Sequence, residues 1–393
     1  MEAHIVEWLN LTVRWVHMIT GIAWIGASFY FNFLENSLNR TQGLRDELAG
    51  NLWAIHGGGF YYLEKYKISP QKIPKNLHWF KWEAYSTLLS GITLLGIVYY
   101  FNAQIYMVDS SVADITSFQA IGVGVGTLIF GWFVYDLMCK SALVNKQYLF
   151  AGIGFALVVL VSYLLSHYLS ARAAYIHVGA MLGTIMVLNV FFVIIPSQKA
   201  MVNSAIKGEE RDPSLGKKAL VRSIHNNYMT LPVLFIMISN HFPSTFGNEN
   251  SWMVLSALTL IGVGVRHWFN LRGKGKKNVW LLPLAAIAMI FMVFITRPQQ
   301  VEVSGIVTDA QVESIVEAHC VSCHSKSPSS EIFSAPPKGM IFDSLGQVKE
   351  KAQLIKAQAV TTKAMPLGNM SGMTDAERQI LGQWLGQLEV NSQ

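Results

Sequence analysis

The sequence predicts an all-α protein in two parts: an eight-helix transmembrane bundle and then a small all-α domain. The first observation is a series of apolar runs about twenty residues long, which matches the ~30 Å hydrocarbon core of a bilayer. The second is composition, because a mean hydropathy of +0.34 and only 14% charged residues do not suit a soluble chain of 393 residues. The third is the more polar region after residue 306, where two amphipathic helical patterns flank a pair of closely spaced cysteines.

The apolar runs define the eight helices in order. They cover residues 8–34, 84–102, 117–138, 148–169, 172–196, 226–243, 252–271 and 278–296. We do not expect the first run to be a cleaved signal peptide, because Glu2 and Glu7 precede it where basic residues are typical. The domains predicted are an integral membrane domain over 1–297, a linker over 298–306 and a second domain over 307–393.

Lysine and arginine are unevenly shared between the loops. The loops after the first, third, fifth and seventh runs hold most of them, whereas the loops 103–116 and 244–251 hold none. The positive-inside rule therefore makes the basic loops cytoplasmic. With an even number of helices, both termini are then periplasmic in a bacterial inner membrane. The net charge of +6 reflects this orientation, and because the basic residues are spread over separate loops we expect no nucleic-acid partner.

Cys320 and Cys323 are followed directly by His324, in the C-x-x-C-H spacing that attaches a c-type haem. Two thiols at this spacing reach the two vinyl groups of one porphyrin, and the adjacent imidazole then ligates the iron. The alternatives are a redox dithiol or half of a zinc site, but zinc needs a second ligand pair and Cys139 lies far upstream. Haem c is attached outside the cytoplasm, which agrees with a periplasmic carboxyl end. The motif predicts one-electron transfer.

Met365, followed by Pro366, is the predicted second ligand of this haem iron. A thioether opposite a histidine is usual in electron-transfer cytochromes and raises the reduction potential. We favour Met365 because Pro366 stiffens the loop that holds a weak ligand. Met340, Met370 and Met373 are the alternatives, and each is also compatible with plain packing.

Helical patterns lie on both sides of these ligands. The segment before the motif has one apolar face, formed by Val312, Ile315 and Val316. The segment after Met365 has another, formed by Ile380, Leu381, Trp384 and Leu388, and Thr374 is its predicted N-cap. The order of helix, haem motif, Met-Pro loop and terminal helix resembles a class I cytochrome c. This resemblance covers about residues 305–393.

Ionisable residues within a bilayer are costly and are therefore candidates for function. His17 in the first run and His177 in the fifth are the deepest histidines, and Arg14 lies on the same helical face as His17. Each histidine is either hydrogen-bonded between helices or a ligand of a second haem, haem b, that the two would hold together. The sequences around them are similar enough for a four-plus-four parallel repeat, although a chance match of aromatic-rich helices is an equal alternative.

Longer stretches carry a resemblance to a known family. They are GIAWIGASFYFNFLE (21–35), AIHGGGFYYLEKYK (54–67), LHWFKWEAYSTLLSG (77–91), SIHNNYMTLPVLFIMISNHF (223–242) and the CVSCH motif. Together they resemble the bacterial membrane-bound cytochrome c urate oxidase (urate hydroxylase) family over essentially the whole chain. The first run is also similar, more weakly, to membrane protoporphyrinogen oxidases, in which a histidine at the place of His17 is linked to haem b.

The resemblance implies an enzyme of purine breakdown that oxidises urate to 5-hydroxyisourate. It implies that electrons pass through haem c to the respiratory chain instead of forming peroxide. The acceptor after haem c stays open between a soluble cytochrome c and a terminal oxidase. Urate is a planar anion, so its pocket needs a cation, amide groups and proton acceptors. The candidates are Arg14 or Arg266 for the anion, Asn226, Asn227 and Tyr228 for the purine edges, and Glu83 or His225 for the proton.

Structural roles are the alternatives to these functional roles. Asn226 and Asn227 are equally suited to capping a helix end, and snorkelling to the interface explains Arg266. The segment His56–Gly59 is interpreted as a flexible turn. Two other functions stay open: an electron-transfer cytochrome that oxidises a quinol or another metabolite, and a transporter with a cytochrome sensor domain. Broken helices at Pro232 or Pro283 would favour the transporter.

Overall fold

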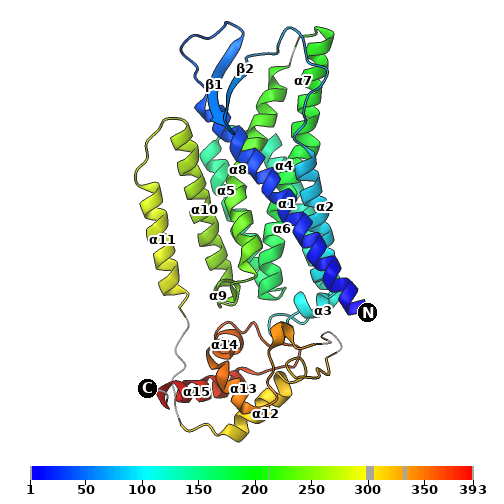
Figure 1. Ribbon diagram of the computed structural model, residues 1–393, viewed down its shortest axis with the longest axis vertical. Helices are drawn as coiled ribbons and strands as arrows, with labels where there is room; N and C mark the ends of the chain where they lie inside the picture. The colour runs from blue at the N-terminus through cyan, green and yellow to red at the C-terminus, as the bar shows by residue number, and fades with distance from the viewer. Residues whose placement is uncertain (1, 211, 298–304, 331–332, 334, 392–393) are drawn as a thin grey trace.

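The structure is a computed structural model that describes residues 2–210, 212–297, 305–330, 333 and 335–391. A long bundle of helices is followed by a smaller helical part beyond its lower end (Figure 1). The predicted linker lies largely outside the described residues, because residues 298–304 are not among them.

Helices lie over all eight predicted ranges, although several ends differ from the apolar runs. They are α1 (Glu2–Ser37), α2 (Trp82–Leu95), α4 (Ser117–Lys140), α5 (Gln147–Ser166), α6 (Ala171–Asn189), α7 (Ile195–Lys207), α8 (Pro213–Ser239), α10 (Ser251–Gly273) and α11 (Leu281–Ile295). A π-helical turn, Gly96–Tyr100, extends α2, and another, Val190–Ile194, joins α6 to α7. The short helices α3 (Ala103–Tyr106) and α9 (Pro243–Phe246) lie at the lower end of the bundle (Figure 1).

Within the described residues, four helices are long and apolar enough to cross a membrane: α4, α5, the continuous helix Ala171–Lys207 and α10. The helix α11 is apolar but shorter. Large apolar side chains also face outward, such as Phe118 and Phe130, which are 85% and 70% exposed. Lipid covers surfaces of this kind, so the chain is compatible with a membrane protein. The eight-span topology, the periplasmic orientation and the four-plus-four repeat stay predictions.

A β-hairpin departs from the all-α prediction. Strand β1 (Leu48–His56) pairs antiparallel with β2 (Gly59–Tyr66), and His56 lies opposite Gly59. Gly57 and Gly58 have φ angles of +56° and +80°, which a two-residue hairpin turn requires and glycine adopts without strain. The interpretation of this segment as a turn is confirmed. The strands were missed because a search for runs about twenty residues long does not detect short segments with irregular alternation.

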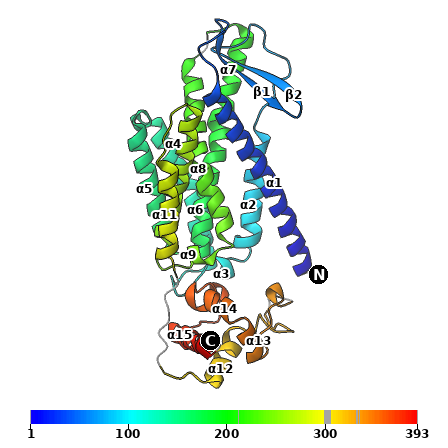
Figure 2. The same cartoon turned by 60° about the vertical axis from the view of Figure 1, so that its left-hand side comes forward.

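The helix α6 occupies the centre of the bundle (Figure 2). It is buried on most of its faces and packs against α4, α5 and α8. A Cβ atom on Gly179 would lie 2.5 Å from Cγ2 of Ile236, so the lack of a side chain there lets α6 and α8 approach closely. The buried face of α6 therefore fixes the positions of the polar side chains on its neighbours.

The carboxyl-terminal part has its own apolar core. Its helices are α12 (Asp309–His319), α13 (Leu345–Glu350), α14 (Ala352–Ile355) and α15 (Asp375–Asn391). The predicted apolar faces of α12 and α15 pack against each other, with Trp384 only 2% exposed. The Glu377 N–H donates to the Thr374 hydroxyl at 3.2 Å, so Thr374 caps α15 as predicted.

The segment 362–369, which we term the docking loop, lies against the lower end of the bundle. A Cβ on Gly368 would lie 2.6 Å from the carbonyl oxygen of Ile105 beside α3. A Cβ on Gly247, just after α9, would lie 2.3 Å from the carbonyl oxygen of Thr362. Ala364 also packs on the core of the bundle. The two parts thus meet backbone against backbone, at the loop that carries Met365.

Candidate functional site

Cys320, Cys323 and His324 occupy the turn that ends α12. The N–H groups of Cys323 and His324 donate to the carbonyl oxygen of Cys320 at 3.2 and 2.9 Å. All three side chains therefore project from one tight turn. Both thiols are free and partly buried. This geometry suits two thioether bonds to one porphyrin, with the imidazole beside it.

The His324 ring is oriented as a metal ligand is. Its Nδ1 lies 3.1 Å from the carbonyl oxygen of Met340, to which only a protonated Nδ1 donates, and this leaves Nε2 as the basic nitrogen. Burial lowers the pKa of the His324 imidazole, which keeps it neutral near pH 7.

Neither alternative for the cysteine pair fits this turn. Burial raises the pKa of the Cys320 thiol to about 11, whereas a redox-active cysteine has a lowered pKa. Among the described residues, no group of three or more His, Cys, Asp and Glu side chains is placed to hold a metal ion. The donor set therefore fits a haem c better than a redox dithiol or a zinc site.

The structure separates the four candidate methionines. Met370 is 53% exposed. The carbonyl oxygen of Met340 accepts a hydrogen bond from the His324 ring. Met373 is buried in the core. Met365 lies at the edge of the same core as Cys320, and its backbone is held by Gln358 at 3.0 Å and by the Arg378 guanidinium at 2.6 Å. Met365 stays the predicted ligand of the haem iron.

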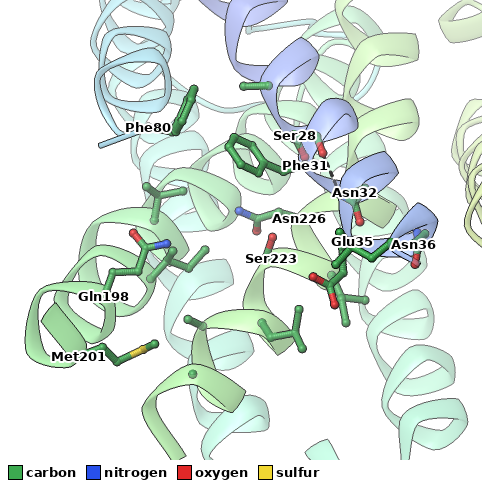
Figure 3. Close-up of a pocket in the computed structure, with 18 of the residues that line it drawn as sticks. Ser28, Phe31, Asn32, Glu35, Asn36, Phe80, Gln198, Met201, Ser223 and Asn226 are labelled. Atoms are coloured by element: carbon green, nitrogen blue, oxygen red, sulfur yellow. Dashed lines mark hydrogen bonds between the residues drawn. The ribbon is translucent and has the colours of Figure 1, made fainter. Parts of the chain in front are cut away.

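A cleft of about 1350 Å³, lined by both apolar and polar side chains, opens at the opposite end of the bundle, between α1, α7, α8 and the segment 66–80. Figure 3 shows Ser28, Phe31 and Asn32 of α1 facing Ser223 and Asn226 of α8. The Phe31 ring meets Phe80 edge to face at 4.7 Å, which adds aromatic surface. The cleft wall also includes Tyr228, Thr230 and Asn270. Sequence reasoning missed the cleft, because its walls come from segments far apart in the chain.

Arg266 lies one helical turn before Asn270, which lines the cleft. It is 7% exposed, and its Nε donates to the Asn227 side-chain oxygen at 2.9 Å. Asn270 donates to the same oxygen at 3.0 Å, and the Arg266 guanidinium stacks over Phe29 at 4.0 Å from the ring centroid. Two of the predicted residues, Arg266 and Asn227, are therefore in direct contact.

The other amide candidate has a different environment. Asn226 accepts from Asn189 at 2.8 Å and donates to the carbonyl oxygen of Met186 at 2.9 Å, so its amide is used at both ends. Both asparagines lie well inside α8, which begins at Pro213, and the capping interpretation is therefore wrong. The predicted helix began too late because the residues before 226 are too polar for an apolar run.

A buried ion pair was missed for the same reason. Arg222 donates to the Asp136 carboxylate at 2.6 Å and to Asn189 at 3.0 Å, and it is only 5% exposed. The predicted helix 226–243 left Arg222 in the preceding loop. The signal available in the sequence was a lone aspartate near the end of the third apolar run, because a carboxylate there favours a cationic partner.

Of the remaining candidates, Arg14, His225 and Glu83 are not part of the cleft wall. Arg14 is exposed near the amino end of α1 and donates to Asn10 at 3.1 Å. His225 stacks on Phe150 and lies 2.9 Å from the Tyr135 hydroxyl. One carboxylate oxygen of Glu83, in the first turn of α2, is buried with no described partner. Tyr228 does line the cleft, and its hydroxyl lies 2.7 Å from Nδ1 of His267, which was not predicted.

The two deep histidines lie at different levels. His17 lies 3.1 Å from the Ser90 hydroxyl, whereas His177 stacks on Tyr100 with a ring separation of 5.8 Å. Ten residues of helix between these contacts correspond to ~15 Å. His177 Nε2 is buried without a hydrogen-bond partner among the described residues. The ring packs against Gly124, where a Cβ atom would lie 2.5 Å from this nitrogen. This arrangement does not fit a single haem b iron shared by both rings, and the second haem stays a prediction.

Together these features define a class: a mostly helical protein with membrane-compatible helices and a large cleft at one end. The chain belongs to the urate oxidase N-terminal family, whose profile matches residues 3–297. No curated protein and no solved structure matches the chain. Membership indicates an oxidoreductase that acts on urate. The match ends at residue 297, which is the predicted end of the integral membrane domain, so it does not cover the C-x-x-C-H motif.

Proposed function

We propose that this protein oxidises urate to 5-hydroxyisourate at the bacterial inner membrane and delivers the electrons through a periplasmic haem c to the respiratory chain. The observation that carries the proposal is the combination, in one chain, of a urate oxidase family match with a C-x-x-C-H motif in a single backbone turn. A one-electron carrier would have no use in an oxidase that hands electrons directly to O2. The acceptor after it would be a soluble cytochrome c or a terminal oxidase.

The reaction balances without peroxide. The urate monoanion and one water give 5-hydroxyisourate, one proton and two electrons, as a C5–O bond forms and a water O–H bond breaks. The protein has to hold the anion and accept protons. Tyr228, which lines the cleft, and its partner His267 form a hydrogen-bonded pair that is suited to accept protons. Asn226 shapes the wall, because its own amide is already hydrogen-bonded.

The carboxyl-terminal residues would hold the prosthetic group. Cys320 and Cys323 would form the thioether bonds, and His324 and Met365 would ligate the iron. When bound, such a haem supplies a one-electron acceptor of raised potential. The docking loop keeps Met365 beside the helical part, because Gly368 contacts the backbone at Ile105.

The test is turnover without oxygen. Detergent-solubilised protein is mixed with urate and ferricyanide under argon, and urate is followed by its ultraviolet absorbance. We expect urate to disappear with two ferricyanide ions reduced for each urate. Turnover that needs O2 and yields one peroxide per urate would contradict the proposal.

Replacing Met365 by alanine should remove the methionine-to-iron absorption band. It should also lower the haem potential by on the order of 0.1 V, within the ~0.8 V range that axial ligands set. Redox titration of the purified protein measures both. The matched control is Met370→Ala, since Met370 is exposed and should leave band and potential unchanged. The reverse pattern would assign the ligand to Met370.

A further inference from the structure

We propose that Arg266 is the residue that binds the anionic edge of the substrate, in a site that it forms with Asn227 beside Asn270 and Tyr228 in the cleft wall. The identity of the ligand, the urate monoanion, rests on the proposed function. The existence of an anion site rests on the structure alone. The inference decides between the two arginines that sequence reasoning left open, and it places the substrate at the end of the bundle away from the carboxyl-terminal domain (Figure 1).

The first observation is that Arg266 is a buried cation without a counterion. Among the described residues, no carboxylate lies within ion-pair distance of its guanidinium, and its hydrogen bond there is the one from Nε to Asn227. Burying an unpaired charge is costly, so natural proteins pair it or use it. Arg222 on α8 is a buried arginine of the paired kind, because the Asp136 carboxylate neutralises its charge.

The second observation is an unsatisfied donor next to this cation. Asn227 is fully buried, and its side-chain oxygen accepts from both Arg266 and Asn270. Its amide nitrogen has no hydrogen-bond partner among the described residues. Buried polar groups are hydrogen-bonded in the great majority of proteins, so an unsatisfied donor beside an unpaired cation indicates a missing acceptor.

The surroundings fit a planar anion. The planar guanidinium of Arg266 lies over the Phe29 ring, and its one side-chain hydrogen bond to a described residue is made by Nε, so the two terminal nitrogens are left for a bidentate contact. Tyr228 and Asn270 connect this position to the cleft, whose aromatic wall includes Phe31 and Phe80. A lipid phosphate is the other anion available near a helix end. We favour urate because Arg266 is only 7% exposed and its neighbours Asn270 and Tyr228 line the cleft.

The test compares Arg266→Gln, Arg266→Lys and the control Arg272→Gln, since Arg272 is exposed in the last turn of the same helix. Urate binding is measured by equilibrium dialysis in lipid-free detergent. We expect Arg266→Gln to weaken urate binding at least tenfold, Arg266→Lys to weaken it less, and Arg272→Gln to leave it unchanged. Without urate, Arg266→Gln should unfold at an equal or higher temperature, because an unpaired buried charge is removed.

The outcomes are separable. Urate bound equally well by the wild-type protein and Arg266→Gln would overturn the site and leave the proposed function standing. Wild-type protein that neither binds nor oxidises urate would refute the proposed function instead. An Arg266→Gln effect seen in phospholipid vesicles and not in detergent would assign the arginine to a lipid headgroup and overturn the inference. A lowered unfolding temperature together with unchanged binding per folded molecule would make Arg266 structural.

Discussion

A chain in which serine replaces both Cys320 and Cys323 is expected to carry no covalently bound haem and to lose urate-driven electron transfer completely. Serine is nearly the same size as cysteine, and the bonds that shape the turn come from backbone N–H groups to the Cys320 carbonyl oxygen. The turn should therefore keep its form while the thioether bonds become impossible. Haem staining after denaturing electrophoresis measures the covalent group directly.

Cys139→Ser is the matched control for this experiment. Cys139 lies on α4, where its sulfur is 3.8 Å from Nδ1 of His225, so it takes no part in the C-x-x-C-H turn. This variant should stain for haem like the wild-type protein. Haem staining of the double serine variant at the wild-type level would show that the prosthetic group is held elsewhere.

Replacing Asp136 by asparagine should destabilise the helical part by about 3–5 kcal/mol, because it leaves the buried Arg222 without its counterion. The Lys140 ammonium also pairs with Asp136 at 2.6 Å, but Lys140 is 70% exposed. Lys140→Met should therefore cost less than about 1 kcal/mol. Unfolding in mixed detergent micelles, followed by tryptophan fluorescence, measures both changes.

The double variant Asp136→Leu, Arg222→Met completes this comparison. Apolar residues of similar size remove both charges together, so most of the lost stability should return. A double variant as unstable as Asp136→Asn would show that Arg222 contributes chiefly through its bonds to Asn189 and its stacking on Tyr135.

Local patterns were sufficient for much of the fold. Apolar runs located the helices because each is defined by neighbours in sequence, and the capping of α15 by Thr374 follows from one short motif. Helix ends were harder. The start of α8 at Pro213 is polar, so the hydropathy pattern began at 226 and placed Arg222 in a loop.

The candidate site depends on contacts that hydropathy does not contain. Residue type made Arg14 and Arg266 equal candidates for the anion. Only the packing of α1, α8 and α10 shows that Arg14 is exposed beside Asn10 while Arg266 is buried without a counterion. Likewise, the spacing of His17 and His177 along the chain does not show that His17 contacts α2 whereas His177 contacts the π-helical turn that extends it.

The most direct test of the central claim is an anaerobic titration of the oxidised, haem-loaded protein with less than half an equivalent of urate per haem. The absorption bands of reduced haem c are followed together with the loss of urate. The account predicts two haems reduced for each urate consumed and no hydrogen peroxide. Urate that disappears while the c-type bands stay oxidised, or haem that stays oxidised with excess urate, would contradict it.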